Sequence, residues 1–244
     1  MDEALYHAFF HQEEEHWWFA ARTAIVREVL RVYGNLSPGE TLLDIGCGTG
    51  AMLKALASTY RVIGIDTSHL ALKYSRARGL HDVFQMKVHE FPRDEFKVKT
   101  ALLLDVIEHV QDDVDILRQA RNVIEPDGRV VVTVPAHMWL WSGHDVVNQH
   151  YRRYSKASLQ QALARAGLTP VKLTFFNTLL FPAVVAAKIV SRARGARRPH
   201  VTADERIAPG NMIVKAIFES EKYLIPRMTL PTGVSLLAVA RPMA

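Results

Sequence analysis

Short apolar runs alternate with amphipathic stretches through the middle of the chain. Nearly continuous apolar runs occupy residues 41–45, 61–66, 100–105 and 129–134, and a weaker run lies at 82–86. Strands that read as unbroken apolar runs are typical of a parallel sheet covered by helices on both faces. Stretches of helical pattern separate the runs, at residues 52–58, 68–78 and 112–124. This alternation predicts an α/β fold with a mainly parallel, Rossmann-like sheet.

The pattern changes on either side of this region. Residues 5–33 read as one helical segment, which a turn-forming stretch at 35–39 ends. After Pro135 we expect a polar and aromatic loop, then a helix at 155–166. Two further strands, at 170–176 and 234–241, would bring the sheet to seven strands.

A long stretch separates the last two predicted strands, far longer than a hairpin connection needs. We interpret it as a helical insertion with helices at 178–194 and 212–223. The chain then divides into three parts. These are an N-terminal helical lid at 1–35, a ligand-binding α/β domain at 36–177 and 229–244, and the helical insertion at 178–228.

Composition narrows the class of protein. Of 244 residues, 49% are hydrophobic and 23% are charged, so the chain can bury an ordinary core and is not a disordered protein. The single cysteine cannot form an internal disulfide, and the net charge of +5 is mild. The N-terminus lacks a signal-peptide pattern, and no apolar run reaches the ~20 residues of a membrane-spanning helix. We therefore expect a cytoplasmic protein.

Glycines cluster at the turn that follows the first predicted strand. The sequence LLDIGCGTG at 42–50 has the spacing G-x-G-x-G, not the G-x-G-x-x-G of the dinucleotide fingerprint. Open α/β sheets bind ligands at this edge, and glycine lets a ligand approach the backbone. Asp44 precedes the first glycine and suits a cationic group, while Asp66 ends the second strand and suits a ribose diol. Together they predict a nucleoside ligand with a cationic amino-acid portion.

Four segments in order carry a family resemblance: LLDIGCGTG, VIGID, LLLDVIEHV and PDGRVVVTVP. Over residues 36–135 the chain resembles the class I S-adenosylmethionine-dependent methyltransferases, and among them the group that includes the ubiquinone-biosynthesis O-methyltransferases. The resemblance implies S-adenosyl-L-methionine as cofactor and S-adenosyl-L-homocysteine as product. It assigns to the cofactor Asp44, Gly46, Cys47, Gly48, Gly50, Asp66, Thr67, Ser68 and Asp105.

The sequence departs from the resemblance at the expected adenine site. Many relatives carry an acidic residue before a Leu-Pro pair, whereas this chain has Lys87 and then Phe91-Pro92. We therefore expect Val88 or His89 to contact the adenine instead.

Methyl transfer to a hydroxyl or an amine also needs a group that removes a proton. His109 is the first candidate for this base, because the ordinary pKa of histidine is near 6.5. The alternative for His109 is packing and hydrogen bonding under the cofactor. Asp105, Glu108 and His109 also resemble the metal ligands of the ubiquinone-pathway enzymes, and such a set would suit Mg²⁺. We expect no metal there.

A second group of polar and aromatic residues follows the fifth predicted strand, at the same edge of the sheet. Histidines and tryptophans on a loop over a rigid edge favour an acceptor pocket. His144 is the alternative base, and an arginine would bind an anionic acceptor group. The alternatives are that Arg153 and Tyr154 tie the loop to the next helix, and that the N-terminal tryptophans pack in the core. The predicted acceptor-binding residues are Trp17, Trp18, Trp141, Asp145, His150, Arg152, Arg153 and Tyr154.

The predicted insertion begins with an apolar stretch that leads into arginines at 192–198. This pattern favours peripheral contact with an anionic membrane through residues 178–198, or a tunnel for a greasy acceptor. A helix that merely caps the domain is the alternative. The chain carries no nucleic-acid-binding motif, so we expect no nucleic acid as partner.

The function that the sequence favours is methyl transfer from S-adenosylmethionine to an oxygen of a small-molecule or lipid-like acceptor, less readily to nitrogen or carbon. A nicotinamide-dependent oxidoreductase is the alternative on a similar sheet, and the glycine spacing and Asp44 disfavour it. A catalytically silent protein that binds S-adenosylmethionine is the third interpretation. The identity of the acceptor and the oligomeric state are left open.

Overall fold

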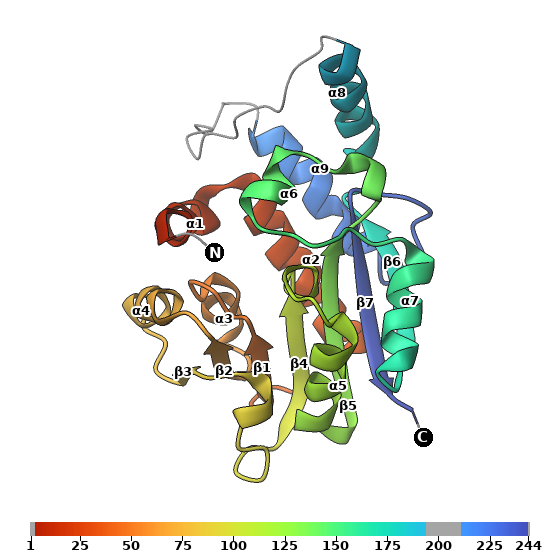
Figure 1. The fold of residues 1–244 in the computed structure, drawn as a ribbon. Coiled ribbons are helices and arrows are strands. Elements are labelled where there is room, and N and C mark those ends of the chain that lie inside the picture. The colour runs from red at the N-terminus through yellow and green to blue at the C-terminus, as the bar shows by residue number, and fades with distance from the viewer. Residues whose placement is uncertain (1–2, 194–210, 244) are drawn as a thin grey trace.

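The computed structural model describes residues 3–193 and 211–243. Its described residues contain a sheet of seven strands (Figure 1). The strands are β1 (Thr41–Ile45), β2 (Arg61–Asp66), β3 (Val83–Gln85), β4 (Val98–Leu104), β5 (Ile124–Pro135), β6 (Leu168–Phe176) and β7 (Ser235–Pro242). Their order is β3-β2-β1-β4-β5-β7-β6. Only β7 runs antiparallel to its neighbours, so the prediction of a mainly parallel sheet is confirmed.

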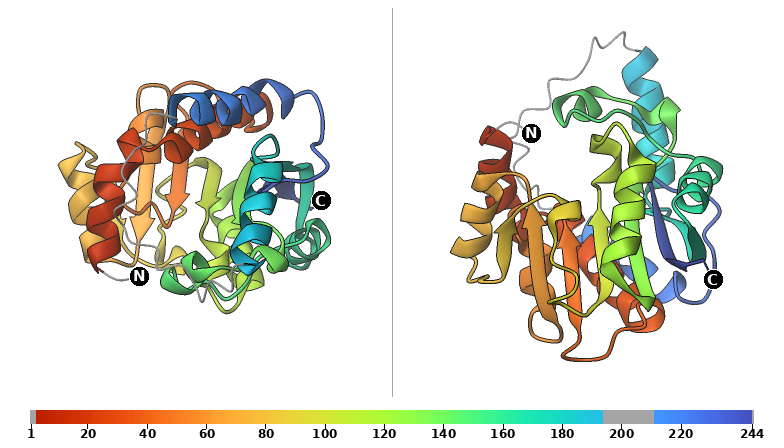
Figure 2. Two further views of the ribbon diagram at one scale, coloured as in Figure 1. Left: turned by 90° about the horizontal axis from the view of Figure 1, so that it is seen from above. Right: turned by 60° about the horizontal axis from the view of Figure 1, so that its bottom comes forward.

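Helices cover both faces of the sheet (Figure 2). The longer ones are α1 (Glu3–Glu15), α2 (Trp17–Tyr33), α3 (Ala51–Leu56), α4 (His69–Ala77), α5 (Asp113–Val123), α7 (Lys156–Arg165), α8 (Phe181–Ala193) and α9 (Asn211–Leu224). The short ones are α6 (Gly143–Val147) and the 3₁₀ turns η1 (Val88–Glu90), η2 (Ile107–His109) and η3 (Met138–Leu140). The predicted helical stretch at 68–78 corresponds to α4. The Ser68 hydroxyl caps this helix by accepting from the Ala71 N–H at 3.3 Å.

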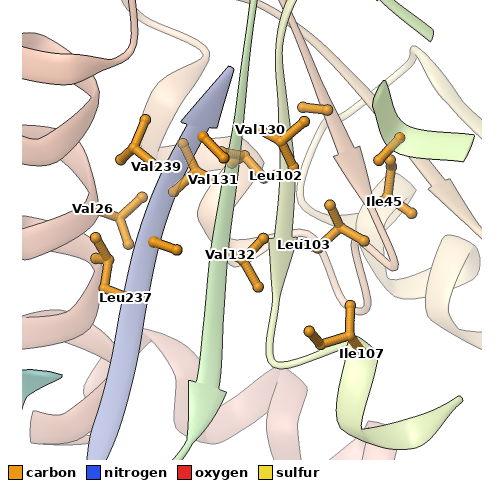
Figure 3. Close-up of a cluster of buried hydrophobic side chains, with 14 of the residues drawn as sticks. Val26, Ile45, Leu102, Leu103, Ile107, Val130, Val131, Val132, Leu237 and Val239 are labelled. Carbon is orange, nitrogen blue, oxygen red and sulfur yellow. The ribbon is translucent and has the colours of Figure 1, made fainter. Parts of the chain in front are cut away.

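The N-terminal segment differs from its prediction as one helix. It forms two helices, and His16 ends the first and caps the second by accepting from the Trp18 N–H at 3.3 Å. The apolar face of α2 is fully buried, including Ile25, Val26 and Leu30. In Figure 3, Val26 faces Leu237 on β7. The stretch assigned to a lid therefore contains one helix built into the core and one, α1, outside it.

α1 packs against α4, on the β2 side of the sheet. The ring of Phe10 stacks on Tyr74 at 4.8 Å between centroids, and the guanidinium of Arg78 lies 4.5 Å from the Phe10 ring centroid. The same guanidinium donates to the Phe10 carbonyl at 2.7 Å and to the Glu13 carboxylate at 3.2 Å. These contacts hold α1 above the carboxyl ends of β1 and β2 (Figure 1).

The core lies on both faces of the central strands. Leu102 and Leu103 of β4, Val131 of β5 and Val239 of β7 have no exposed surface (Figure 3). The order of strands changes direction between β1 and β4, and ligands of open α/β sheets bind at the carboxyl ends of strands at such a point. The fold thus brings the glycine turn after β1 beside Asp105 after β4.

The predicted insertion contains the two expected helices, α8 and α9, with bounds a few residues from those predicted. Glu221 of α9 fixes the start of α8, because its carboxylate accepts from the Thr178 and Leu179 N–H groups at 2.6 and 2.8 Å. Most of the arginine-rich part of 178–198 lies outside the described residues. Within residues 3–193 and 211–243, every helix is too short or too polar to cross a membrane. The division of the chain into three parts stays a prediction.

Candidate active site

A cavity of about 480 Å³ opens at the carboxyl ends of β1 and β4. α1 and the start of α2 form one side of it, and the glycine turn, η2 and the loop around α6 form the others. A concave site at this edge is the expected position of a ligand in an open α/β fold. The predicted residues that line it are Trp17, Trp18, Asp44, Gly46, Cys47, Gly48, Asp105, His109, His144, His150 and Arg153.

The glycine turn is fixed to the second strand by its backbone. The Gly46 and Cys47 N–H groups both donate to the Ile65 carbonyl, at 2.8 and 3.1 Å. A Cβ at Gly46 would lie 2.9 Å from a methyl group of Val106, so a side chain does not fit there. At Gly48, with φ +55°, no described atom lies within 4 Å of the place of a Cβ. The turn therefore leaves open space above Gly48 that a ligand can fill.

Asp66 braces this turn from the end of β2. Its carboxylate accepts from the Gly48 N–H at 3.0 Å and from the Ser68 N–H at 2.8 Å. Burial raises the pKa of this carboxyl, and the backbone hydrogen bonds partly offset the rise. Asp66 is not among the residues that line the described cavity, whereas Tyr6 of α1 lines it and lies close to Asp66 and Ser68. α1 thus covers the end of the site where the sequence predicts the ribose.

Asp44 is a buried carboxyl at the floor of the cavity. Only 3% of the residue is exposed, and this burial raises its pKa to about 7. Arg22 of α2 acts in the opposite direction through its charge. Such a carboxyl is stabilised in its ionised form by a cation, so the site fits the cationic end of S-adenosylmethionine.

Arg22 pairs with one acidic residue of the site and acts on Asp44 through its charge, and sequence reasoning missed it. Its guanidinium forms an ion pair with Asp105 and lies 4.6 Å from the ring centroid of Trp18. Asp105 has a φ of +58° and its N–H donates to the Thr133 carbonyl at 2.9 Å. Left-handed backbone at a non-glycine residue is strained and is concentrated at functional sites. The helical spacing from Trp18 to Arg22 was the available signal.

Three histidines lie on the opposite side of the cavity. The rings of His109 and His150 meet edge to face, with their centroids 4.6 Å apart. The ring centroid of His144 lies 6.3 Å from that of His150. Burial lowers the pKa of His109 to about 4, so its imidazole is neutral at pH 7. Burial also lowers the pKa of His144, and the charge of Asp145 partly offsets it.

Asp145 organises the loop that carries these histidines. Its buried carboxylate accepts from His150 Nδ1 at 3.0 Å, from Arg153 Nε and Nη2 at 2.7 and 2.9 Å, and from the Ser142 N–H at 2.8 Å. These hydrogen bonds and the Arg153 charge hold the pKa of Asp145 well below its usual range, against the effect of burial. Asp145 was predicted to bind the acceptor, but it lies behind the wall that His150 and Arg153 form.

Other predicted acceptor residues face away from the cavity. The Tyr154 hydroxyl donates to Asp113 at 2.7 Å, and Arg152 donates to the Gln111 carbonyl at 2.6 Å. Tyr154 thus ties the loop to the start of α5, whereas the alternative expected it to tie the loop to the next helix, α7. The predicted residues outside the described cavity lining are Gly50, Asp66, Thr67, Ser68, Val88, His89, Trp141, Asp145, Arg152 and Tyr154.

The structure adds residues that the sequence did not suggest. Several come from α1, and no motif marks that helix. The aromatic ones extend the wall that Trp17 and Trp18 begin. The added lining residues include Tyr6, Phe9, Glu13, His16, Phe19 and Arg22.

The metal set suggested by resemblance is not assembled. Asp105 is paired with Arg22, whereas the described residues that cluster are Glu108, His109 and His150, each with a ligand atom within 4.8 Å of the others. Glu108 is fully buried, and burial and the charge of Asp105 raise the pKa of its carboxyl well above the usual range. These three residues are the ones that could hold a metal ion.

The chain is similar to known methyltransferases in sequence. A family model described as a methyltransferase domain matches residues 16–173. A probable S-adenosylmethionine-dependent methyltransferase of Mycolicibacterium smegmatis is 27% identical over 158 residues, which are 63% of this chain and 60% of that protein. A ubiquinone biosynthesis O-methyltransferase of Bordetella avium is 30% identical over 99 residues, 39% of this chain and 41% of that protein. The chain spans less than two thirds of the length of these relatives.

Solved structures share the fold over nearly the whole chain. A methyltransferase in a complex with the Haloferax volcanii Trm112 activator has a TM-score of 0.63 at 18% identity, covering 99% of this chain and 95% of that one. A geranyl diphosphate methyltransferase bound to S-adenosylmethionine has a TM-score of 0.58 at 18% identity, covering 91% and 85%. The family match covers more than half of the chain and agrees with the glycine turn and its carboxylates, and the chain belongs to the methyltransferase-domain family.

Proposed function

We propose that this enzyme transfers a methyl group to an oxygen of a small, largely apolar acceptor that binds between α1, α2 and the loop around α6. One observation carries the proposal: a single cavity joins the glycine turn to an aromatic wall and three histidines. S-adenosylmethionine, when bound, supplies an electrophilic methyl group on a sulfonium sulfur. The protein then has to align an acceptor atom with that methyl and remove a proton from it.

The cofactor half of the cavity would use few side chains. We assign the ribose hydroxyls to Asp66, because it ends β2 and accepts from the N–H of Gly48, where space is open. We assign the cationic amino-acid portion to Asp44, because it lines the cavity near the end of β1. Thr67 and Ser68 would lie beside the ribose, and Val88 or His89 beside the adenine. α1 covers this end of the site and would have to accommodate the cofactor.

The acceptor half is lined by aromatic rings. Phe9, Trp17, Trp18 and Phe19 contribute to the wall, so an apolar or aromatic acceptor would gain most from burial there. Arg153 also reaches the cavity, but its guanidinium is already bonded to Asp145. An anionic acceptor is therefore less well matched than a neutral one.

Of the two histidines predicted as base, we assign the role to His144. A base works best when its pKa lies near the working pH, and burial lowers the pKa of His109 to about 4. Burial lowers the pKa of His144 as well, but His144 lines the same cavity and the charge of Asp145 partly offsets that effect. His109 would then have another role in the site.

A lipid-like acceptor is the more specific form of this proposal. Ile189 and Val190 of α8 are 61% and 46% exposed, which supports contact of residues 178–198 with a membrane that holds such an acceptor. Co-sedimentation with anionic vesicles tests the contact. Ile189→Asp should reduce binding, and equal binding of the variant would contradict membrane contact through α8.

Methyl transfer itself is tested with labelled S-adenosylmethionine and a panel of phenols, hydroxylated isoprenoids and amines. Once an acceptor is found, His144→Ala should lower kcat by about 10²- to 10⁴-fold at saturating cofactor, because it removes a general base. His81→Ala, an exposed histidine away from the cavity, is the control and should keep the wild-type rate. A full rate in His144→Ala would refute the assignment of the base, and transfer to amines alone would refute the oxygen acceptor.

A further inference from the structure

Glu108 is the least explained polar group in the cavity. It has no exposed surface, and neither carboxyl oxygen has a hydrogen-bond partner among the described residues. Burying a carboxyl without a partner is costly, so native proteins rarely do it without a reason. The residue also lines the cavity. A buried acid without a partner at a binding site indicates that its carboxylate serves to bind a ligand.

Two imidazoles stand beside this carboxyl. Glu108 and His109 belong to η2 after β4, whereas His150 comes from the loop after α6. One ligand atom from each of the three residues lies within 4.8 Å of the other two. Elements far apart in the sequence therefore bring two imidazole nitrogens and a carboxylate oxygen together on one wall.

The position of His150 is set by a second carboxylate. Asp145 accepts from His150 Nδ1 at 3.0 Å, which leaves Nε2 as the nitrogen with a free lone pair. Arg153 and Ser142 hold Asp145 in place in turn. A histidine that binds a metal through one nitrogen almost always donates from the other to a carboxylate or a carbonyl. His150 already has this arrangement.

We propose that Glu108, His109 and His150 bind one divalent transition-metal ion on the cavity wall, with Asp145 orienting His150. Two imidazoles and one carboxylate are a ligand set for ions such as Zn²⁺, Co²⁺, Mn²⁺ or Fe²⁺. The set differs from the one implied by resemblance, because His150 takes the place of Asp105, which Arg22 engages. A set with two nitrogens is also less suited to Mg²⁺, which prefers oxygen ligands.

Three protein ligands leave coordination positions open toward the cavity. An acceptor hydroxyl bound there would be held near the cofactor half and would lose its proton more readily, since a metal ion lowers the pKa of a bound hydroxyl. The ring centroids of His144 and His150 are 6.3 Å apart, so His144 lies close enough to take part in removing that proton. This role rests on the proposed methyl transfer, but metal binding can be measured without any acceptor or cofactor.

The test uses the full chain after treatment with a chelator and dialysis. Titration with Co²⁺ alone should show one equivalent bound, both by calorimetry and by the visible absorption of the bound ion. Zn²⁺ should then displace Co²⁺ and bleach that absorption. His150→Ala, His109→Ala and Glu108→Gln should each weaken binding by about 100-fold or more, and Asp145→Asn by about 10- to 100-fold.

Two variants separate this site from its alternatives. His144→Ala removes a neighbouring histidine outside the cluster and should bind Co²⁺ as the wild type does. Asp105→Asn should bind normally here, whereas it would abolish binding at the set implied by resemblance. Each variant is compared by its thermal unfolding, so that a misfolded one is recognised and replaced by the corresponding glutamine or serine variant. The proposal is overturned if the wild type binds no equivalent, or if binding survives in both histidine variants of the cluster.

Discussion

The two sides of the cavity are built in different ways. On the side of β1 and β2, backbone N–H groups and the Asp66 carboxylate fix the glycine turn by hydrogen bonds. The residues that form these bonds come from adjacent stretches of sequence. On the side of η2 and α6, the wall consists of side chains from four separate elements, held by one buried carboxylate. The difference teaches that the cofactor half is encoded locally, while the acceptor half depends on tertiary packing.

Asp145→Ala should have the largest effect, because it removes the charge that holds the acceptor side together. The change leaves the Arg153 guanidinium and His150 without their partner, and breaking a buried ion pair costs about 3–5 kcal/mol. Urea denaturation should show this loss in the free energy of unfolding. Calorimetry should find S-adenosylmethionine affinity within about threefold of wild type, because the cofactor half is built without this loop.

The matched control is Asp127→Ala, because the ion pair of Asp127 with Lys99 lies at the surface and such pairs contribute little to stability. If Asp145→Ala lowered stability no more than Asp127→Ala, the acceptor wall would not depend on one carboxylate. A large loss of cofactor affinity would show instead that the two halves are coupled.

Asp66→Ala tests the cofactor half and should reduce S-adenosylmethionine affinity by about 100-fold. The carboxylate would accept from the ribose hydroxyls, and it also braces the turn through Gly48 and Ser68. Hydrogen bonds to a charged group contribute about 1.5–3 kcal/mol each, so the loss of the ribose contacts alone accounts for a change of this size. Calorimetric titration measures the affinity directly.

Asp66→Asn is the graded variant, since the amide keeps one acceptor oxygen, and it should fall between the wild type and the alanine variant. Wild-type affinity in Asp66→Ala would rule out the assignment of the ribose to this residue. Asp82→Ala, at an exposed position before β3, controls for a general effect of removing an acid from this part of the sheet.

The same contrast explains what the sequence could predict. The strands and the mainly parallel sheet follow from the apolar runs, and these predictions are confirmed. The break at His16 was missed because no glycine or proline marks it, and only the polar run at 11–16 separates the apolar residues of α1 from those of α2. The part that α1 plays in the cavity depends on contacts such as Phe10 with Tyr74, which no local pattern encodes.

Candidate residues of the acceptor loop show the limit more sharply. Arg152, Arg153 and Tyr154 are consecutive, yet only Arg153 lines the described cavity. Partners that are distant in sequence decide which of these three side chains faces the cavity. Asp113, for example, accepts a hydrogen bond from the Tyr154 hydroxyl. Residue types in a loop indicate that a pocket exists, but packing decides which of them reach it.

Titration of Asp44 should have the smallest of the predicted effects on cofactor affinity, and this effect depends on charge more specifically than the others. Its pKa is about 7 in the folded protein and near 3.8 when exposed, because burial disfavours the ionised form. Between about pH 4 and 7 the folded state keeps a proton that the unfolded state has released. The contribution of Asp44 to stability therefore falls as pH rises through this window and levels off above it.

Cofactor affinity should change in the opposite direction, because a cationic ligand favours the ionised carboxylate. Affinity for S-adenosylmethionine should rise by up to about tenfold per pH unit below pH 7 and reach a plateau above it. Asp44→Asn has no proton to lose, so its affinity should be weaker at pH 8 and should lack the part of the slope that Asp44 contributes. Titrations of both proteins from pH 5.5 to 8 measure the difference, in which the titration of the groups that the two proteins share cancels. Parallel pH profiles for the two proteins would mean that the cationic end of the cofactor binds elsewhere, and the carboxylate at the floor of the cavity would then need another explanation.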